Sequence, residues 1–385
     1  MVEPLTAERA VALVGFVRAR GRATWMVRGE AAWGPLEEWW GRRRTVRWRD
    51  LGVPSRSVGR LVDAALEDQV DRDLAWIEAN GWRVIDPSEV VALRELPEPP
   101  VLLLARGDLG DAPRLAMVGA RRASAYGLRI ADQIARGVAA NGVEVVSGLA
   151  RGVDGAAHAG ALAVGGRTLA VLGAGPDVVY PPEHAALMSE IGIHGTLLTE
   201  HLPGVPPRPA HFPRRNRILV ALTQALLVVE ARLKSGTLTS VRWALDLGRD
   251  VLVVPGSIES PLSEGPIQLL REGAIPVGGP DHVLEAMGLD DETSLVATPA
   301  ADHDATPAEE RLLTLLAGDG LDLDDLVRFS GDAPSRVLTL LLSLELRDLV
   351  VRGEGMRWRT GRARSAGDQE NRGAKENPGA DPDLI

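Results

Sequence analysis

The 385-residue sequence contains no cysteine, which excludes disulfide bonds, thiolate metal sites and a cysteine nucleophile. Long apolar runs are also missing, since none approaches the roughly 20 residues that a membrane-spanning helix needs. The first residues lack the basic-then-apolar pattern of a secretory signal. We therefore expect a soluble cytoplasmic protein that makes no contact with a membrane.

Recognisable catalytic patterns are absent as well. No group of His, Asp and Glu has metal-ligand spacing, and no Ser-His-Asp order is evident. The segment Lys234-Ser235-Gly236-Thr237 lacks the upstream glycine and the Gly-Lys-Ser order of a Walker loop, which excludes ATP hydrolysis by that mechanism. We expect no catalytic residue, no metal ion and no cofactor.

Charge is distributed unevenly along the chain. The formal net charge is −10, which argues against a generally cationic protein but does not exclude a local basic face. Residues 206–249 carry eight basic side chains against Glu230 and Asp246, a net charge of +6. This segment opposes the sign of the whole chain and indicates an anionic partner.

Length and composition predict several domains. A small helical module of the SAM or helix-hairpin-helix kind is followed by a proline-rich hinge and an α/β core. An acidic linker precedes three helices and a hairpin, which together predict a winged helix, and the polar tail is expected to be disordered. The predicted boundaries are 1–95 for the helical domain, 96–288 for the core, 289–306 for the linker, 307–360 for the winged helix and 361–385 for the tail.

The helical module combines arginines and tryptophans. Arg42, Arg43, Arg44 and Arg47 lie among Trp39, Trp40 and Trp48, and the nearby segment 51–56 resembles the turn of a small nucleic-acid-binding module. Arginine beside tryptophan can bind a nucleic-acid backbone through charge and stacking. We favour the simpler interpretation, in which the tryptophans fill a small core and the arginines form a solvated face.

The middle of the chain alternates short β-branched runs with helical segments. This pattern predicts the α/β class, an extended Rossmann-like, doubly wound and mostly parallel sheet that is buried on both faces. Such sheets bind ligands at the carboxyl ends of their strands. Strands are expected at 101–104, 115–118, 143–147, 168–172, 196–200, 226–230 and 250–254, with helices at 127–141, 154–164, 183–192 and 237–247.

Five loops that contain glycine follow these strands, at 119–127, 148–155, 173–184, 234–237 and 254–257. Because they all follow strands, we expect them to converge on one edge of the sheet as a polyanion groove. Arg151 lies between two glycines and can approach a phosphate closely. For Asp154 we expect helix capping, for His158 a place on a helix face, and for Tyr180 either base stacking or packing on proline.

The stretch His211–Arg217 contains three arginines and is predicted to be a loop that feeds a helix beginning after Arg217. A helix start carries unpaired N–H donors and partial positive charge, which favours anion binding. Beside the glycine loops, this stretch is predicted to form one wall of a phosphate groove. The residue patterns do not decide which of the three arginines faces a ligand.

Several of these segments together are similar to the DNA-processing protein A family (DprA/Smf). The resemblance rests on Ser147–Asp154, Tyr180-Pro181-Pro182, Phe212–Arg217, Val229–Gly236 and Val254-Pro255-Gly256, in an order and spacing that agree with the family from about 96 to 280. One departure is Gly119-Ala120-Arg121, where the family usually has Gly-Ser-Arg. The change removes a hydroxyl but keeps the arginine.

The resemblance implies a Rossmann-like core without established catalysis, single-stranded DNA binding in natural transformation, loading of the RecA recombinase, and a homodimer. Carried over residue by residue, the expected DNA or phosphate contacts are Arg121, Arg151, Arg214, Arg215, Arg217, Lys234, Ser235, Gly236 and Thr237, with Tyr180 and Phe212 as candidates for base stacking.

Two alternatives stay open. The same loops resemble those of phosphoribohydrolases, in which Glu230 would be the acid or nucleophile, although the Gly-Gly-x-Gly-Thr loop of such enzymes is missing. The winged helix could instead read duplex DNA through its Ser335-Arg336 helix. That helix has few basic residues, so we favour an accessory or protein-contact role for this domain.

Overall fold

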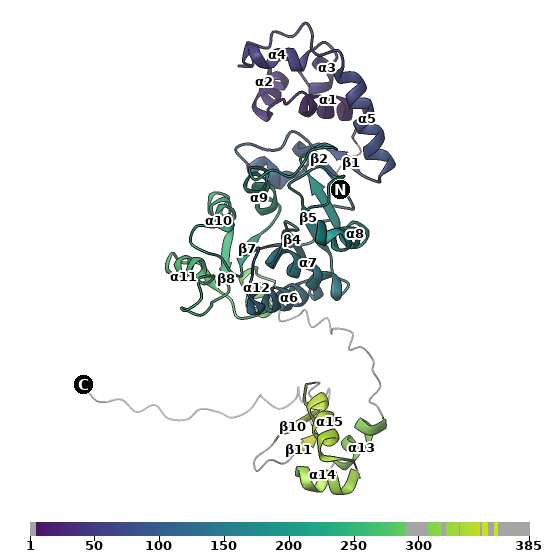
Figure 1. The fold of residues 1–385 in the computed structure, drawn as a ribbon, viewed down its shortest axis with the longest axis vertical. Helices are drawn as coiled ribbons and strands as arrows, with labels where there is room; N and C mark the ends of the chain where they lie inside the picture. The colour runs from purple at the N-terminus through teal and green to yellow at the C-terminus, as the bar shows by residue number, and fades with distance from the viewer. Residues whose placement is uncertain are drawn as a thin grey trace, which may run out of the picture. The chain divides into compact units, whose positions relative to one another are not determined.

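A computed structural model describes residues 5–289, 307–316, 321–330, 332–346, 349–352 and 358–360. The predicted linker, apart from Leu289, and the predicted tail lie outside these residues. The chain divides into two compact units, residues 1–294 and 295–385, which are considered separately (Figure 1). Among the described residues, no helix is both long and apolar enough to cross a membrane.

Five helices form an N-terminal layer of the first unit (Figure 1). Phe16 packs edge-on against Trp39 and Trp40, and Trp48 packs against Trp39. These tryptophans are buried, which confirms that they fill a core. The core continues into the sheet through Leu102 and other apolar residues. The helices are α1 (Ala7–Arg18), α2 (Ala23–Trp33), α3 (Leu36–Trp40), α4 (Ser55–Leu61) and α5 (Leu66–Ala79).

A nine-stranded sheet forms the centre of the same unit, with the order β1-β2-β6-β5-β4-β3-β7-β8-β9. The seven strands from β6 to β9 in this order pair in parallel, whereas β1–β2 and β2–β6 pair antiparallel. The mostly parallel doubly wound sheet is thereby confirmed. The strands are β1 (Arg83–Ile85), β2 (Leu103–Arg106), β3 (Arg114–Val118), β4 (Glu144–Ser147), β5 (Thr168–Val171), β6 (Thr196–Thr199), β7 (Ala225–Val228), β8 (Asp250–Val253) and β9 (Ile275–Pro276).

Apolar cores cover both faces of the sheet because successive strand residues point to opposite sides. Leu115 and Met117 of β3 belong to the core that contains α6, whereas Ala116 and Val118 belong to the core that contains α9. The helices are α6 (Ala125–Ala140), α7 (Val153–Ala163), α8 (Ala185–His194), α9 (His211–Ala221), α10 (Thr237–Asp246), α11 (Glu264–Arg271) and α12 (Pro280–Ala286), with 3-10 turns η1 (Pro87–Glu89), η2 (Val91–Glu95) and η3 (Pro182–His184).

Two short edge strands were not predicted. β1 lies within the segment that we expected to be entirely helical, and β9 contains only two residues. Both stand at the ends of the strand order, where one neighbour suffices and proline is tolerated. Runs this short carry no periodicity that distinguishes a strand from a loop. The strand predicted at 101–104 lies two residues later, and it runs antiparallel to its neighbours.

The second unit contains α13 (Pro307–Leu315), α14 (Leu323–Ser330) and α15 (Pro334–Leu346), followed by the antiparallel strands β10 (Val350–Arg352) and β11 (Trp358–Thr360). Its core consists of buried leucines and valines from the three helices together with Trp358. Three helices and a hairpin agree with the predicted winged helix. Its expected N-cap, Thr306, lies outside the described residues.

Candidate nucleic-acid interface

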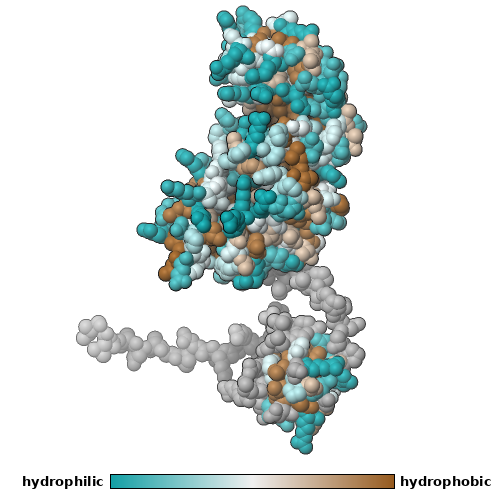
Figure 2. Space-filling view, viewed as in Figure 1, coloured by the Kyte–Doolittle hydropathy of each residue, from teal (hydrophilic) through white to brown (hydrophobic). Residues whose placement is uncertain are grey.

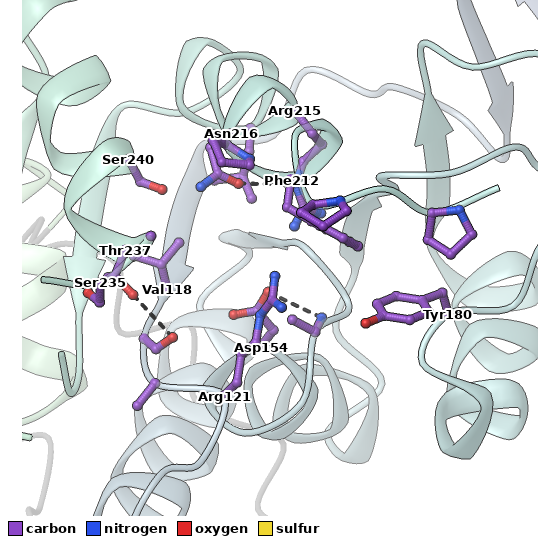
Figure 3. A pocket seen from close by; sticks show the side chains of 18 residues that line it. Val118, Arg121, Asp154, Tyr180, Phe212, Arg215, Asn216, Ser235, Thr237 and Ser240 are labelled. Atoms are coloured by element: carbon purple, nitrogen blue, oxygen red, sulfur yellow. Dashed lines mark hydrogen bonds between the residues drawn. The ribbon is translucent and has the colours of Figure 1, made fainter. Parts of the chain in front are cut away.

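A pocket of about 520 Å³ opens at the carboxyl ends of β3 and β7. The chain runs from β3 to β6 on one side of this point and from β7 to β9 on the other, so it is the topological switch point of the sheet, where doubly wound folds bind ligands. We call it the switch pocket. Its lining includes Arg121 and Asp154, Tyr180, Phe212, Arg215, Asn216, Ser235, Thr237 and Ser240 (Figure 3).

Four of the five predicted glycine loops supply residues to this lining, which confirms most of their expected convergence. The fifth loop, Val254–Ser257, is not part of the pocket. Its Pro255 carbonyl instead accepts a hydrogen bond from Tyr126, 3.1 Å away. It follows β8, one strand further from the switch point, and is therefore displaced from the pocket.

The prediction that a helix begins after Arg217 was wrong, because α9 begins at His211 and contains all three arginines. Pro213 lies in the first turn, where the missing N–H breaks no helical hydrogen bond. The arginines therefore point in different directions around a helix. Figure 3 shows Arg215 and Asn216 on one wall of the switch pocket, opposite Arg121 and Asp154.

Arg217 is buried and forms a two-pronged ion pair with Glu200, with Nη2 2.8 Å from Oε2 and Nη1 3.0 Å from Oε1. Its Nε donates to the Glu98 carbonyl. Burial alone would raise the pKa of Glu200, but the guanidinium holds that pKa below its ordinary value. Arg217 does not line the switch pocket, so its position is that of an internal tie between β6 and α9.

Arg215 is also buried, yet it lines the pocket. Its Nη1 donates to the carbonyls of Gly148, at 2.8 Å, and Val171. Burial lowers the pKa of Arg215 to about 10, and the nearby Asp154 opposes this shift, so the guanidinium stays charged at neutral pH. A side chain at position 148 would overlap this guanidinium, which explains the glycine.

Asp154 does not cap α7, contrary to our expectation. It lies in the first turn of that helix and accepts hydrogen bonds from the backbone of Gly148 and Ala150, at 3.1 and 3.3 Å. Its burial raises the pKa of the carboxyl, while Arg215 opposes the shift. Asp154 and Arg215 thus hold the 148–151 loop from two sides.

His158 lies on the buried face of the same helix, behind the loop. Its Nε2 accepts from the Leu149 N–H at 3.3 Å. Thr168 donates its hydroxyl proton to the Val145 carbonyl, so Nδ1 of His158 donates to the Thr168 oxygen at 2.6 Å. Burial lowers the pKa of His158 to about 3. This neutral histidine is a structural residue.

Exposed cations surround the pocket. Arg121 lines it, with its guanidinium 4.8 Å from the centre of the Phe212 ring, and Arg214 and Lys234 are exposed nearby in the chain. Arg151 is exposed but pairs with Glu183. Arg214 lies 3.8 Å from Glu200 and keeps 62% of its side chain exposed. Of the five arginines expected to contact DNA, Arg121, Arg151 and Arg214 are therefore accessible.

Two aromatic rings stand together beside the pocket. Tyr180 and Phe212 lie 5.3 Å apart at an angle of 37°. Phe212 also packs over Gly173, where a side chain would come within 2.9 Å of the ring. Both residues line the pocket, as expected for candidate stacking residues, and their partial exposure leaves room for a flat ligand.

Hydroxyl groups lie on the remaining wall. The Thr237 hydroxyl donates to the Gly119 carbonyl at 3.3 Å, which ties the loops after β3 and β7. Within residues 5–289, the buried hydroxyls of Ser235 and Ser240 have no protein partner. Ser240 and Asn216 were not predicted as site residues. Both lie inside helices whose apolar patterns gave no signal of the pocket.

Glu230, the proposed acid or nucleophile of a nucleotide hydrolase, is absent from the pocket lining. It is buried and accepts hydrogen bonds from the N–H and hydroxyl of Ser124, at 2.9 and 2.6 Å. The Ser124 hydroxyl in turn accepts from the Gly127 N–H and caps α6. Glu230 therefore fixes the loop after β3 to β7.

A family model described as DNA recombination-mediator protein A matches residues 84–288, and the model of the DprA winged helix domain matches residues 296–356. The chain belongs to the DNA recombination-mediator protein A family. The first match begins within β1, so the family's core includes the strand that sequence reasoning missed.

Relatives of this recombination-mediator family cover most of the chain. The protein Smf of Escherichia coli K12 is 36% identical over 313 residues, which span 77% of this chain and 82% of the relative. The X-ray structure of DprA from Streptococcus pneumoniae is 30% identical, with a TM-score of 0.62 over 74% of this chain and 98% of its own. DprA from Helicobacter pylori, described with a unique single-stranded DNA binding mode, is 30% identical with a TM-score of 0.50, over 54% of this chain and 96% of its own.

Proposed function

We propose that this chain binds single-stranded DNA at the switch pocket and acts as a recombination mediator. The observation that carries the proposal is the arrangement of accessible cations and paired aromatic rings at one pocket, where Arg121 stacks on Phe212 beside Tyr180. Arginines neutralise phosphates, and aromatic rings stack on bases of any sequence. The family description and the DNA-binding relative from Helicobacter pylori support it.

The proposal divides the predicted contact residues by role. Arg121, Arg151, Arg214 and Lys234 would meet phosphates, and Ser235 to Thr237 would present hydroxyl and N–H groups at the start of α10. Arg215 is charged and lines the pocket, but both of its carbonyl contacts hold loops. Arg217 is committed to Glu200 and would act through the shape of α9.

By the resemblance to its family, we extend the proposal to handing the bound strand to the RecA recombinase, to protecting incoming DNA during natural transformation, and to a homodimer in the cytoplasm. These steps need no bond making by the chain. The burial of Glu230 beneath Ser124 supports a binding function over the phosphoribohydrolase alternative, because a carboxylate outside the pocket cannot reach its ligand.

The test is a titration of oligo-dT against salt with the double variant R121A/K234A. We expect wild-type affinity to fall steeply with salt and the variant to lose at least about tenfold, with a shallower salt slope of roughly 0.7 per lost phosphate contact. The matched control is R136A/R271A, which removes two exposed arginines from α6 and α11.

Affinity that stays flat with salt, or an equal loss in the control, would contradict the proposal. The enzymatic alternative is checked on the same preparation by incubating it with nucleoside monophosphates and following free base by chromatography. No base release is expected from the wild type or from Glu230→Gln.

A further inference from the structure

A second basic surface lies in the N-terminal helical layer. Residues 18–60 contain eleven arginines against three glutamates and one aspartate, a net charge of +7 in a chain whose net charge is −10. Nine of these arginines are exposed. By contrast, residues 61–82, which include α5, carry one arginine against six acidic side chains. Charge is thus segregated within one layer.

Most carboxylates of this basic segment are already engaged. Glu30 and Glu37 both accept from Arg9, at 2.6 and 2.9 Å, and Asp50 pairs with Arg47. Within residues 5–289, no ion pair is formed by Arg44, Arg49 or Arg56. These exposed guanidinium groups therefore keep their donors and charge for an external anion.

The segment is held as one surface rather than as separate loops. Arg28 of α2 donates to the Leu51 carbonyl at 3.2 Å, which fixes α2 against the turn that precedes α4. Trp48 donates to the Arg43 carbonyl at 2.9 Å and closes the arginine-rich turn after α3. Figure 2 shows hydrophilic side chains over much of the cap that these helices form.

Aromatic rings distinguish this surface from the switch pocket. Trp39 and Trp48 are 1% and 3% exposed, so they are not available to stack on bases. Single strands are bound by charge together with stacking, whereas a duplex hides its bases and presents two rows of phosphates. Exposed arginines without accessible rings match the second ligand.

We propose that the α2–α4 surface, with Arg28, Arg42, Arg44, Arg49, Arg56 and Arg60 among its exposed residues, is a second site that binds the phosphate backbone of duplex DNA. The chain then holds a single strand at the switch pocket and a duplex at the helical layer. The two sites differ in their chemistry, and the second requires nothing of the first.

The test uses the full chain, a 30-base-pair duplex and oligo-dT of the same length. The variant R44Q/R49Q/R56Q removes three exposed charges, and R72Q/R136Q/R271Q removes three exposed charges elsewhere as the matched control. Unchanged thermal unfolding verifies the fold of each. We expect duplex affinity to fall at least about tenfold, with a salt slope shallower by roughly 0.9 per lost contact, and oligo-dT affinity to change less than about twofold.

Unchanged duplex affinity, as would follow if the winged helix binds the duplex, overturns the proposal, and so does an equal loss in the control. A parallel loss of oligo-dT affinity overturns the assignment to duplex DNA. The variant R121A/K234A separates this proposal from the proposed function, because it should lose oligo-dT and retain the duplex. If oligo-dT binding shows no salt dependence, the proposed function fails while the duplex result still stands by itself.

Discussion

Arg217 of α9 and Glu200 after β6 form a buried two-pronged ion pair at 2.8 and 3.0 Å, and Arg214 lies 3.8 Å from the same carboxylate with most of its side chain exposed. Two arginines three positions apart thus share one acid but have different environments. The sequence shows only a basic cluster, whereas the environments assign one arginine to the frame and the other to the surface.

This difference predicts opposite effects of two substitutions. Arg217→Ala leaves Glu200 buried without its main partner, so we expect it to lower the free energy of unfolding by about 3–5 kcal/mol. Arg214→Ala should cost less than about 1 kcal/mol, because exposed ion pairs contribute little. It should nevertheless weaken oligo-dT binding. Urea unfolding and DNA titration of both variants measure the two effects, and a large stability loss in Arg214→Ala would contradict the assignment.

Phe212 tests whether the paired rings bind bases. Phe212→Ala should weaken oligo-dT binding by about 1–3 kcal/mol, the usual contribution of one stacked base, and should also remove the ring beneath Arg121. Phe212→Tyr keeps the ring and should retain affinity. Binding of oligo-dT and oligo-dC, measured at one salt concentration, should fall together. Equal affinity of the alanine and tyrosine variants would show that the ring only packs on Gly173.

His158 predicts a pH dependence of stability. Its pKa is about 3 in the folded chain and about 6.5 when exposed, so below pH 6.5 the unfolded state binds a proton that the folded state does not. The stabilising effect is complete above pH 6.5 and decreases on acidification. This one group should account for a loss of roughly 1.5 kcal/mol between pH 6.5 and pH 5. Unfolding of wild type and His158→Gln across this range measures it, and parallel pH slopes would contradict the prediction.

Much of the fold followed from local pattern. Short buried β-branched runs between helices predicted the parallel sheet, since side chains of a strand buried on both faces must all be apolar. The three helices and hairpin of the second unit were predicted in the same way. The edge strands β1 and β9 were missed because strands of two or three residues form by pairing with a neighbour, and no local periodicity marks them.

The candidate site was predicted less completely. Glycine loops after parallel strands must meet at one edge, so the order of strands and loops along the chain was enough to place residues such as Arg121, Tyr180 and Ser235 at one pocket. Their proposed DNA contacts remain predictions. The roles of Asp154 and Glu230 were not predictable, because their backbone and hydroxyl partners come from other segments.

By itself, the sequence determined the residue types, the order of elements and the family resemblance, because hydrophobic periodicity and motif spacing are local properties of the chain. Only the tertiary structure decided which arginines are buried. A helix turns by about 100° per residue, so Arg214, Arg215 and Arg217 of one short basic stretch face solvent, loop carbonyls and a buried glutamate, respectively. Accessibility and charge pairing depend on what packs against each side chain.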